Sequence, residues 1–407
     1  MSKQTTQYKQ TEIGLLPSHW EVKKIKEVGE VSSGGTPDTN NPKYWDGNIN
    51  WCTPTDITAL SNKYLGDTIK KITEEGLKNC SAKIQPPNSI IVCTRATIGK
   101  AAINLVPMST NQGFKNIIPT NIDFNFLYYK IISVESGLLK VANGSTFLEV
   151  SKTDFDNFLL SIPPLPEQQR IATILSTWDK AIENVKLIIE HIQTRNKGLA
   201  QQLLTGKMRV KGFEKKWKIT PLNECLNFTP REVPKPTENY KALGLRSHGK
   251  GVFHKLDVDP AGVAMEVLYE VKENDLIVNI TFAWEQAVAI IKKEDEGGLV
   301  SHRFPTYTFK SKNAIPEYFK HYIVQKYFKF LLELISPGGA GRNRVMSKTD
   351  FLKLEIKLPD VQEQKAIANI LDIATTELKA YQQKLEQLQL QKKGLMQQLL
   401  TGKILTV

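Results

Sequence analysis

The sequence predicts an α+β protein with two pseudo-repeated mixed α/β domains separated by two long helices that pair as an antiparallel coiled coil. Three observations predict this fold class. The length of 407 residues suggests two or three domains. A long segment of the chain recurs at a constant spacing, and a heptad pattern of apolar residues runs through both copies. Because domain and helix alternate twice, we expect a pseudo-two-fold, cyclic arrangement with the chain ends near each other.

The internal repeat predicts that the two domains are similar. Ser-Lys-Thr-Asp-Phe at 151–155 recurs at 347–351, Glu-Gln at 167–168 recurs at 363–364, and Gln-Gln-Leu-Leu-Thr-Gly-Lys at 201–207 recurs at 397–403. Every matched pair is 196 positions apart, so neither copy carries an insertion in this stretch. We therefore divide the chain into a first domain (1–160), a first helical segment (161–212), a second domain (213–357) and a second helical segment (358–407).

Each domain shows patterns of strands and short helices. The apolar runs at 88–92 and 274–278 follow turn residues and indicate buried strands. Apolar periodicity predicts helices at 124–132 and 318–334. A Thr-x-Ala sequence follows each predicted strand, at 94–96 and 281–283, so the two scaffolds match.

The two helical segments carry a seam in which apolar residues alternate at spacings of four and three. Prolines precede both segments, and Gly206 and Gly402 are predicted C-caps. A helix of ~40 residues is ~60 Å long, which favours pairing of the two over the alternative that each folds onto its own domain. A polar residue, Asn196 or Lys392, interrupts each seam and is expected to fix its register. The predicted helix-pairing residues are Ile171, Leu175, Trp178, Ile182, Val185, Ile189, Ile192, Leu199, Leu203, Ile367, Leu371, Leu378, Tyr381, Leu385, Leu388, Leu395 and Leu399.

The loops of the two domains differ in their polar residues, although the scaffolds match. They include Arg, Asn, Gln, Ser and His side chains, which bind base edges and phosphates in protein–DNA complexes. A shared scaffold with different polar loop residues suits a protein that recognises two different DNA sequences. The alternative is ordinary drift of surface loops. The net charge of +12 is compatible with a nucleic-acid partner. The candidate DNA-binding residues are Thr94, Arg95, Thr97, Lys100, Asn111, Gln112, Ser145, Thr146, Arg246, Ser247, His248, Lys250, Trp284, His302, Arg303, Arg342, Asn343 and Arg344.

Motifs for catalysis are weak or absent from the sequence. Asn41-Pro42-Lys43-Tyr44 lacks the second proline of an amino-methyltransferase motif, and no Gly-rich loop follows a strand to hold a cofactor. Four cysteines without CxxC spacing predict free thiols rather than a zinc site or a disulfide framework. The chain shows neither a signal peptide nor a long apolar run, so we expect a cytoplasmic protein with no membrane partner.

Taken together, several short motifs resemble the specificity (S) subunits of Type I restriction–modification systems. The resemblance covers nearly the whole chain. In the first domain it rests on Ser-Gly-Gly-Thr-Pro at 33–37, Thr-Arg-Ala-Thr-Ile-Gly at 94–99 and Asn-Gln-Gly-Phe at 111–114. The second domain resembles another variant of the same target recognition domain, at 244–251, 281–285 and 336–344. The sequences at 162–168 and at the two helix ends resemble the family's helical spacers.

The resemblance implies a DNA sequence-specificity subunit that is not itself an enzyme. Each target recognition domain would read one half of an asymmetric, bipartite site in double-stranded DNA through the major groove. The paired helices would set the gap and dock two methyltransferase subunits, which restriction subunits would join. No cofactor would bind this chain, because S-adenosylmethionine, ATP and Mg²⁺ would belong to those partners. Two alternatives are a self-sufficient DNA-modifying enzyme and a coiled-coil scaffold without a DNA role.

Overall fold

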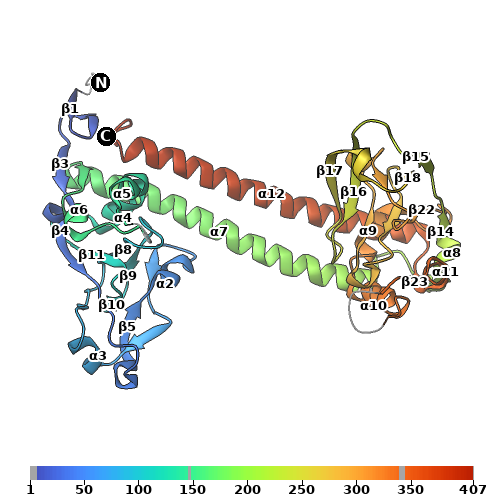
Figure 1. Ribbon diagram of the computed structural model, residues 1–407, viewed down its shortest axis with the longest axis horizontal. Coiled ribbons are helices and arrows are strands. Elements are labelled where there is room, and N and C mark those ends of the chain that lie inside the picture. The colour runs from blue at the N-terminus through green and yellow to red at the C-terminus, as the bar shows by residue number, and fades with distance from the viewer. Residues whose placement is uncertain (1–6, 145–147, 339–343, 407) are drawn as a thin grey trace. The chain divides into compact units, whose positions relative to one another are not determined.

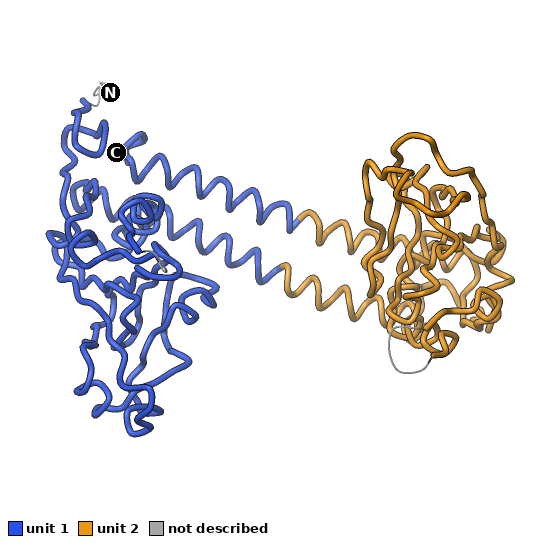
Figure 2. The backbone as a smooth tube through the Cα atoms, viewed as in Figure 1, with its two compact units in different colours: residues 1–188, 381–407 blue, residues 189–380 orange. Residues whose placement is uncertain are grey.

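The computed structural model describes residues 7–144, 148–338 and 344–406, and it divides the chain into two compact units. Unit 1 comprises residues 1–188 and 381–407, and unit 2 comprises residues 189–380 (Figure 2). Two long helices, α7 (Leu165–Leu204) and α12 (Val361–Leu399), contribute one stretch to each unit. Each unit therefore combines a globular domain with two helix segments that are far apart in the sequence.

Unit 1 is a mixed α/β domain with its main sheet in the order β4-β11-β8-β9-β6 (Figure 1). Three smaller sheets pair β1 with β2, β3 with β12, and β5 with both β7 and β10. Its strands are β1 (Tyr8–Thr11), β2 (Gly14–Pro17), β3 (Glu21–Lys24), β4 (Gly29–Ser33), β5 (Trp45–Cys52), β6 (Tyr64–Leu65), β7 (Lys70–Ile72), β8 (Ile90–Cys93), β9 (Ala101–Asn104), β10 (Met108–Thr110), β11 (Phe114–Pro119) and β12 (Leu159–Ile162). Its short helices are α1 (Ile25–Val28), η1 (Pro42–Tyr44), α2 (Pro54–Thr58), α3 (Glu74–Lys78), α4 (Phe124–Ser133), α5 (Glu135–Val141) and α6 (Lys152–Asp156).

Unit 2 contains sheets in the orders β14-β22-β19-β20 and β15-β18-β21-β16-β17, and β13 pairs with β23. Its strands are β13 (Lys218–Pro221), β14 (Leu226–Phe228), β15 (Glu232–Pro234), β16 (Tyr240–Leu245), β17 (Val252–Val258), β18 (Val267–Glu270), β19 (Leu276–Val278), β20 (Val288–Ile290), β21 (Leu299–Val300), β22 (Thr306–Phe309) and β23 (Glu355–Leu358). Its short helices are α8 (Leu222–Cys225), η2 (Pro260–Gly262), η3 (Ala283–Glu285), η4 (Lys293–Asp295), α9 (Pro316–Tyr322), α10 (Lys326–Leu334) and α11 (Lys348–Lys353).

The two domains share a four-stranded frame, as the repeat predicts. The order β4-β11-β8-β9 in unit 1 matches β14-β22-β19-β20 in unit 2. Strands β8 and β19 are the predicted buried strands, and the structure confirms both. Each is apolar and fully buried, because side chains pack on both faces of the strand.

The prediction of one continuous helix at 318–334 is wrong. The structure has two helices there, α9 and α10, separated by residues 323–325. The carbonyl groups freed by this break accept hydrogen bonds from Nε2 of Gln286, at 2.8 Å for Ile323 and 3.1 Å for Gln325. Periodicity alone could not predict the break, because its hydrogen-bond donor lies about forty positions away in the sequence.

The long helices pack against each other within both units. In unit 1, Ile171 and Leu175 near the start of α7 share a core with Leu399 at the end of α12. In unit 2, Leu203 near the end of α7 shares a core with Ile367 and Leu371 near the start of α12. The helices are therefore antiparallel, as predicted. Every predicted seam residue is buried or half-buried. Off-seam apolar residues such as Ile373 and Leu390 are exposed.

The ends of both helices agree with the predicted capping. Gly206 and Gly402 have φ angles of +69° and +71°, in the left-handed region that favours glycine after a helix. Segments near the two ends of the chain are in contact within unit 1, because the hydroxyl of Tyr8 in β1 donates to the carbonyl of Gly402 after α12 at 3.0 Å (Figure 1). This contact fits the predicted cyclic arrangement.

The polar residues in the seam have partners on the opposite helix. The side-chain amide of Asn196 donates to the carbonyl of Ala374 at 2.8 Å. The ammonium group of Lys392 pairs with the carboxylate of Asp179. Because each contact requires one alignment of the helices, both residues favour a single register.

The repeated Glu-Gln pairs connect each helix to its domain. In unit 1, the amide oxygen of Gln168 accepts from the backbone N–H of Asp123 at 2.9 Å, just before α4. In unit 2, Gln364 accepts from Ile315 at 3.2 Å, just before α9. Helices α4 and α9 are therefore equivalent elements of the two domains.

Candidate nucleic-acid interface

The candidate loops lie at the same end of the four-stranded frame in both units. Phe114 at the start of β11 is opposite Cys93 at the end of β8. Thr306 at the start of β22 is likewise opposite Ile277 of β19. The loop that leaves one strand thus meets the loop that enters its neighbour, since the two strands are antiparallel. The frame therefore brings together the loops that carry the candidate DNA-binding residues.

In unit 1 the loop after β8 is a tight turn. The backbone N–H of Gly99 donates to the carbonyl of Cys93 at 2.9 Å, and Ala96 has a positive φ of 63°. Thr94 is fully buried, and its hydroxyl donates to the carbonyl of Gly113 at 3.2 Å. Thr94 thus connects the two loops and does not face solvent. Arg95 and Thr97 are half-buried on the same turn.

The neighbouring loop of unit 1 presents amide side chains. Asn111 is half-buried, and its side-chain oxygen accepts from the N–H of Gly113 at 2.9 Å. Gln112 is exposed and accepts a hydrogen bond from the hydroxyl of Thr36. Lys100 is exposed, with its ammonium group 3.7 Å from the carboxylate of Glu135. Gln112 and Lys100 are both exposed and carry the chemical groups of amide-to-base and cation-to-phosphate contacts, although each already has one partner within the chain.

In unit 2 the hairpin loop between β16 and β17 docks on the turn after β19. The N–H of His248 donates to the carbonyl of Glu285 at 2.6 Å, and the hydroxyl of Ser247 donates to the carboxylate of Glu285 at 2.5 Å. His248 has a positive φ of 62°, and Arg246 and Lys250 are exposed beside it. The contacts order this loop and bring its cations next to the Trp284 turn.

A second group of candidates lies on segments that hydrogen-bond to Ile280. Its N–H donates to the carbonyl of Arg303 at 3.0 Å, and its carbonyl accepts from the N–H of Met346 at 2.8 Å. Arg303 and its neighbour His302 are exposed. The guanidinium carbon of Arg344 lies 5.3 Å from the ring centroid of Trp284, within the range of a cation–π contact. Unit 2 thus brings Arg303, Arg344 and Trp284 to one end of the sheet.

Four candidates, Ser145, Thr146, Arg342 and Asn343, lie outside the described residues. Two residues that position the unit 2 loops are absent from the candidates that the sequence predicts. Glu285 holds the 246–251 hairpin, and Gln286, with a positive φ of 63°, bonds the α9–α10 break. Their only sequence signal is their place after the Thr-x-Ala motif, and this place says nothing about what they contact.

Other chemistry finds little support in the described part of the chain. No group of three or more His, Cys, Asp or Glu side chains there could hold a metal ion. The four cysteines are free thiols, and burial raises the pKa of Cys93 to about 11. Among the residues described, no helix is long and apolar enough to cross a membrane.

Comparison with known families gives one match over most of the chain. The model described as "Type I restriction modification DNA specificity domain" matches residues 17–194 and 262–390. Two of the relatives come from Methanocaldococcus jannaschii. The Type I restriction enzyme MjaIX specificity subunit is 42% identical over 184 residues, or 44% of this chain and 43% of that protein. The putative MjaX specificity subunit is 25% identical over 98% of this chain and 96% of its own length.

Solved structures show the same fold. The HsdS subunit from Thermoanaerobacter tengcongensis superposes with a TM-score of 0.55 at 17% identity, covering 96% of this chain and 98% of that one. The S subunit of a Type I restriction–modification system from M. genitalium gives a TM-score of 0.53 at 15% identity, covering 94% and 96%. At these identities the likeness concerns the fold alone.

Proposed function

Because the chain belongs to the family of Type I restriction modification DNA specificity domains, we propose that it is the DNA-reading subunit of a Type I restriction–modification complex. Each domain reads one half of a bipartite site in double-stranded DNA through the major groove. The two halves differ in sequence, so the complete site is asymmetric.

One observation carries this proposal: the same four-stranded frame presents different polar side chains in the two units. Gln112 and Lys100 stand beside the frame in unit 1. Arg303, Arg344 and Trp284 stand at the corresponding end in unit 2. Amide side chains favour adenine and arginines favour guanine or phosphate, so a common frame with different tips suits two different half-sites.

The long helices complete the proposed role. They set the gap between the half-sites and dock two methyltransferase subunits, with restriction subunits joining the complex. The chain itself performs no catalysis. Adenine methylation with S-adenosylmethionine, and DNA cleavage driven by ATP with Mg²⁺, belong to the partner subunits.

Methylome sequencing tests the proposal directly. A host would express this chain with the methyltransferase subunit encoded beside it, and a second host would lack this chain. We expect a split, asymmetric motif with methylated adenine that disappears in the second host. If no methylated motif depends on the chain, it is not a DNA reader in this system.

A domain exchange tests whether the two units read separately. Residues 213–357 would be replaced by the equivalent segment of a relative with a different target. Only one half of the methylated motif should change. A change in both halves would contradict independent reading by the two domains.

A further inference from the structure

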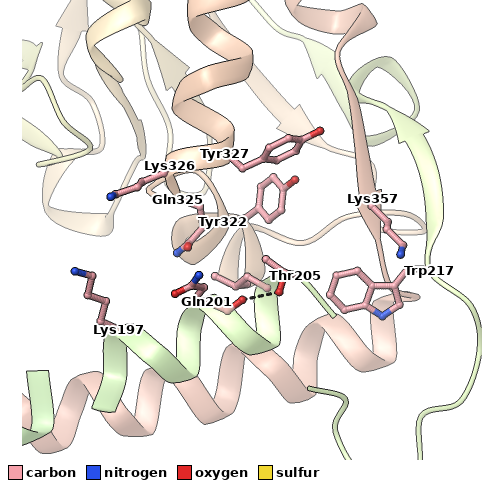
Figure 3. A pocket seen from close by; sticks show the side chains of 10 residues that line it. Lys197, Gln201, Thr205, Trp217, Tyr322, Gln325, Lys326, Tyr327 and Lys357 are labelled. Atoms are coloured by element: carbon pink, nitrogen blue, oxygen red, sulfur yellow. Dashed lines mark hydrogen bonds between the residues drawn. The ribbon is translucent and has the colours of Figure 1, made fainter. Parts of the chain in front are cut away.

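Unit 2 contains an open cavity of about 510 Å³ at the end of α7 (Figure 3). Tyr322 and Tyr327 lie over the last turns of α7, with Trp217 beside β23 at one end of the cavity. Three lysines stand around it: Lys197 and Lys326 at the opposite end, and Lys357 next to Trp217. Aromatic walls with a cationic rim are typical of a binding site rather than a packing defect.

The equivalent position in unit 1 is filled by a lysine side chain. Asp123 and Ile315 are equivalent, because their N–H groups donate to the equivalent residues Gln168 and Gln364. Lys130 of α4 and Tyr322 of α9 each lie seven positions after these residues and therefore correspond to each other. Lys130 is buried, and its ammonium group donates to the hydroxyl of Ser161 at 2.6 Å and to the carbonyl of Leu400 at 2.8 Å. By the repeat spacing, Ser161 and Leu400 correspond to Lys357 and Leu204, which line the unit 2 cavity. The duplicated chain therefore has a closed and an open version of one site.

The charge around the cavity is entirely positive. The residues that line it include Lys197, Lys326 and Lys357 but neither aspartate nor glutamate. Within the described residues, these three ammonium groups have no carboxylate within ion-pair distance. Three unpaired cations around an apolar hollow favour a ligand that combines negative charge with an apolar group.

An exposed apolar stripe extends from the cavity along α10. Tyr327, Phe330 and Leu334 lie at helical spacings of three and four, and their exposed fractions are 53%, 51% and 62%. The buried residues of the same helix, Phe328, Leu331 and Leu332, face the domain core. The helix thus has a second apolar face at the surface, and exposed patches of this kind mark interaction sites.

We propose that the cavity and the α10 stripe bind a partner protein through an acidic amphipathic helix. Its bulky apolar anchor enters between Tyr322, Tyr327 and Trp217, and its carboxylates pair with the three lysines. A helix fits because the stripe repeats at helical spacing, so that anchors at i, i+3 and i+7 meet it. A nucleic-acid backbone offers charge but no apolar row to cover the stripe. None of the residues from which this site is inferred belongs to the candidate DNA-binding residues, so the inference does not rest on the proposed DNA-reading function.

Binding of a designed peptide to the full-length chain tests this inference. The probe is a fluorescein-labelled helical peptide with leucine and phenylalanine anchors at i, i+3 and i+7 and glutamates on its flanks, measured by fluorescence anisotropy. Two comparison ligands are the same peptide with lysine for glutamate and a single-stranded oligonucleotide. We expect only the acidic peptide to bind at this site.

Two variants identify the site. Tyr322→Lys combined with Lys357→Ser installs the residues of the closed unit 1 version. Tyr327→Glu places a repulsive charge on a side chain that is 53% exposed and lies outside the domain core. Each should weaken the acidic peptide about ten-fold or more. Leu139→Glu, at an exposed apolar position on α5 of unit 1, should leave binding unchanged. The proposal is overturned if the wild-type chain does not bind the acidic peptide, if Tyr327→Glu binds it as well as wild type, if the lysine peptide binds equally, or if the variants lose oligonucleotide binding instead.

Discussion

The indole nitrogen of Trp217 donates a hydrogen bond to Oε2 of Glu363 at 3.0 Å, and Trp20 makes the same contact with Glu167 at 3.2 Å. Each tryptophan directly precedes a strand, β3 in unit 1 and β13 in unit 2. These strands pair with β12 and β23, which lead into α7 and α12. Each glutamate lies in the first turn of the corresponding long helix. The contact therefore ties domain to helix in both units. The two glutamates differ in their other partners, because only Glu363 also accepts two hydrogen bonds of 2.7 Å from an arginine, Arg209.

The arginine makes Glu363 the more important of the two carboxylates. Glu363→Ala removes both hydrogen bonds between Arg209 and this carboxylate and leaves the indole of Trp217 without its acceptor. The guanidinium keeps only its bond of 2.9 Å to the carbonyl of Lys215, and we expect a loss of about 3 kcal/mol in the free energy of unfolding of unit 2. Glu167→Ala is the matched control and should cost less, because its second partner, His19, is 43% exposed at the side chain. Urea unfolding followed by tryptophan fluorescence measures both. Equal losses would contradict the role given to Arg209.

The buried lysine of unit 1 predicts a stability that rises with pH. Burial lowers the pKa of Lys130 to about 8 from its ordinary value of 10.5. Between these values the unfolded chain binds more protons than the folded chain, so folding becomes more favourable as the pH rises. Below pH 8 both states are protonated and the dependence vanishes. One proton corresponds to about 1.4 kcal/mol per pH unit.

Calorimetry of the full chain between pH 8 and pH 9.5 measures this slope for the unit 1 transition. Lys130→Met should remove the share due to this group, and part of the slope should persist because burial also lowers the pKa of Lys63 to about 8. The exposed Lys78→Met serves as the control and should keep the wild-type slope. An unchanged slope in Lys130→Met would show that its ammonium group is not destabilised by burial.

Replacing glycine with alanine is expected to have opposite effects at Gly198, inside α7, and at Gly206, which follows the helix. A Cβ added at Gly198, inside α7, would meet nothing within 4 Å, so Gly198→Ala should stabilise the protein by about 0.5–1 kcal/mol through helix propensity. Gly206 has a positive φ of 69° and lies against Trp217, so Gly206→Ala should destabilise it by about 1 kcal/mol. Thermal unfolding compares the two variants. A destabilised Gly198→Ala would mean that this part of α7 is more crowded than the structure indicates.

The cation–π pair of unit 2 predicts a defect in DNA binding by the assembled complex. Arg344→Ala removes the guanidinium next to Trp284, and we expect about ten-fold weaker affinity at moderate salt. The defect should shrink as salt rises, because the variant makes one cationic contact fewer and its affinity therefore depends less steeply on salt. The exposed Lys365→Ala on α12 is the control and should bind like wild type. Fluorescence anisotropy with a duplex that contains the methylated motif gives the affinities. Wild-type affinity in Arg344→Ala would remove this residue from the proposed interface.

The sequence alone determined the features that repeat or have a fixed period. The constant spacing of the repeat predicted two similar domains, and the seam with its prolines and glycines predicted two helices that the structure places at Leu165–Leu204 and Val361–Leu399. These signals are local, because apolar spacing and caps act within a few residues of the positions they define.

Only the tertiary structure decided which side chains meet. The break between α9 and α10 depends on Gln286, the burial of Thr94 depends on Gly113, and the open cavity beside Tyr322 depends on a residue that is lysine in the other copy. Each of these contacts joins residues from distant parts of the chain. Periodicity cannot predict such contacts, because it reports which face of an element is apolar and not which partner the fold brings against it.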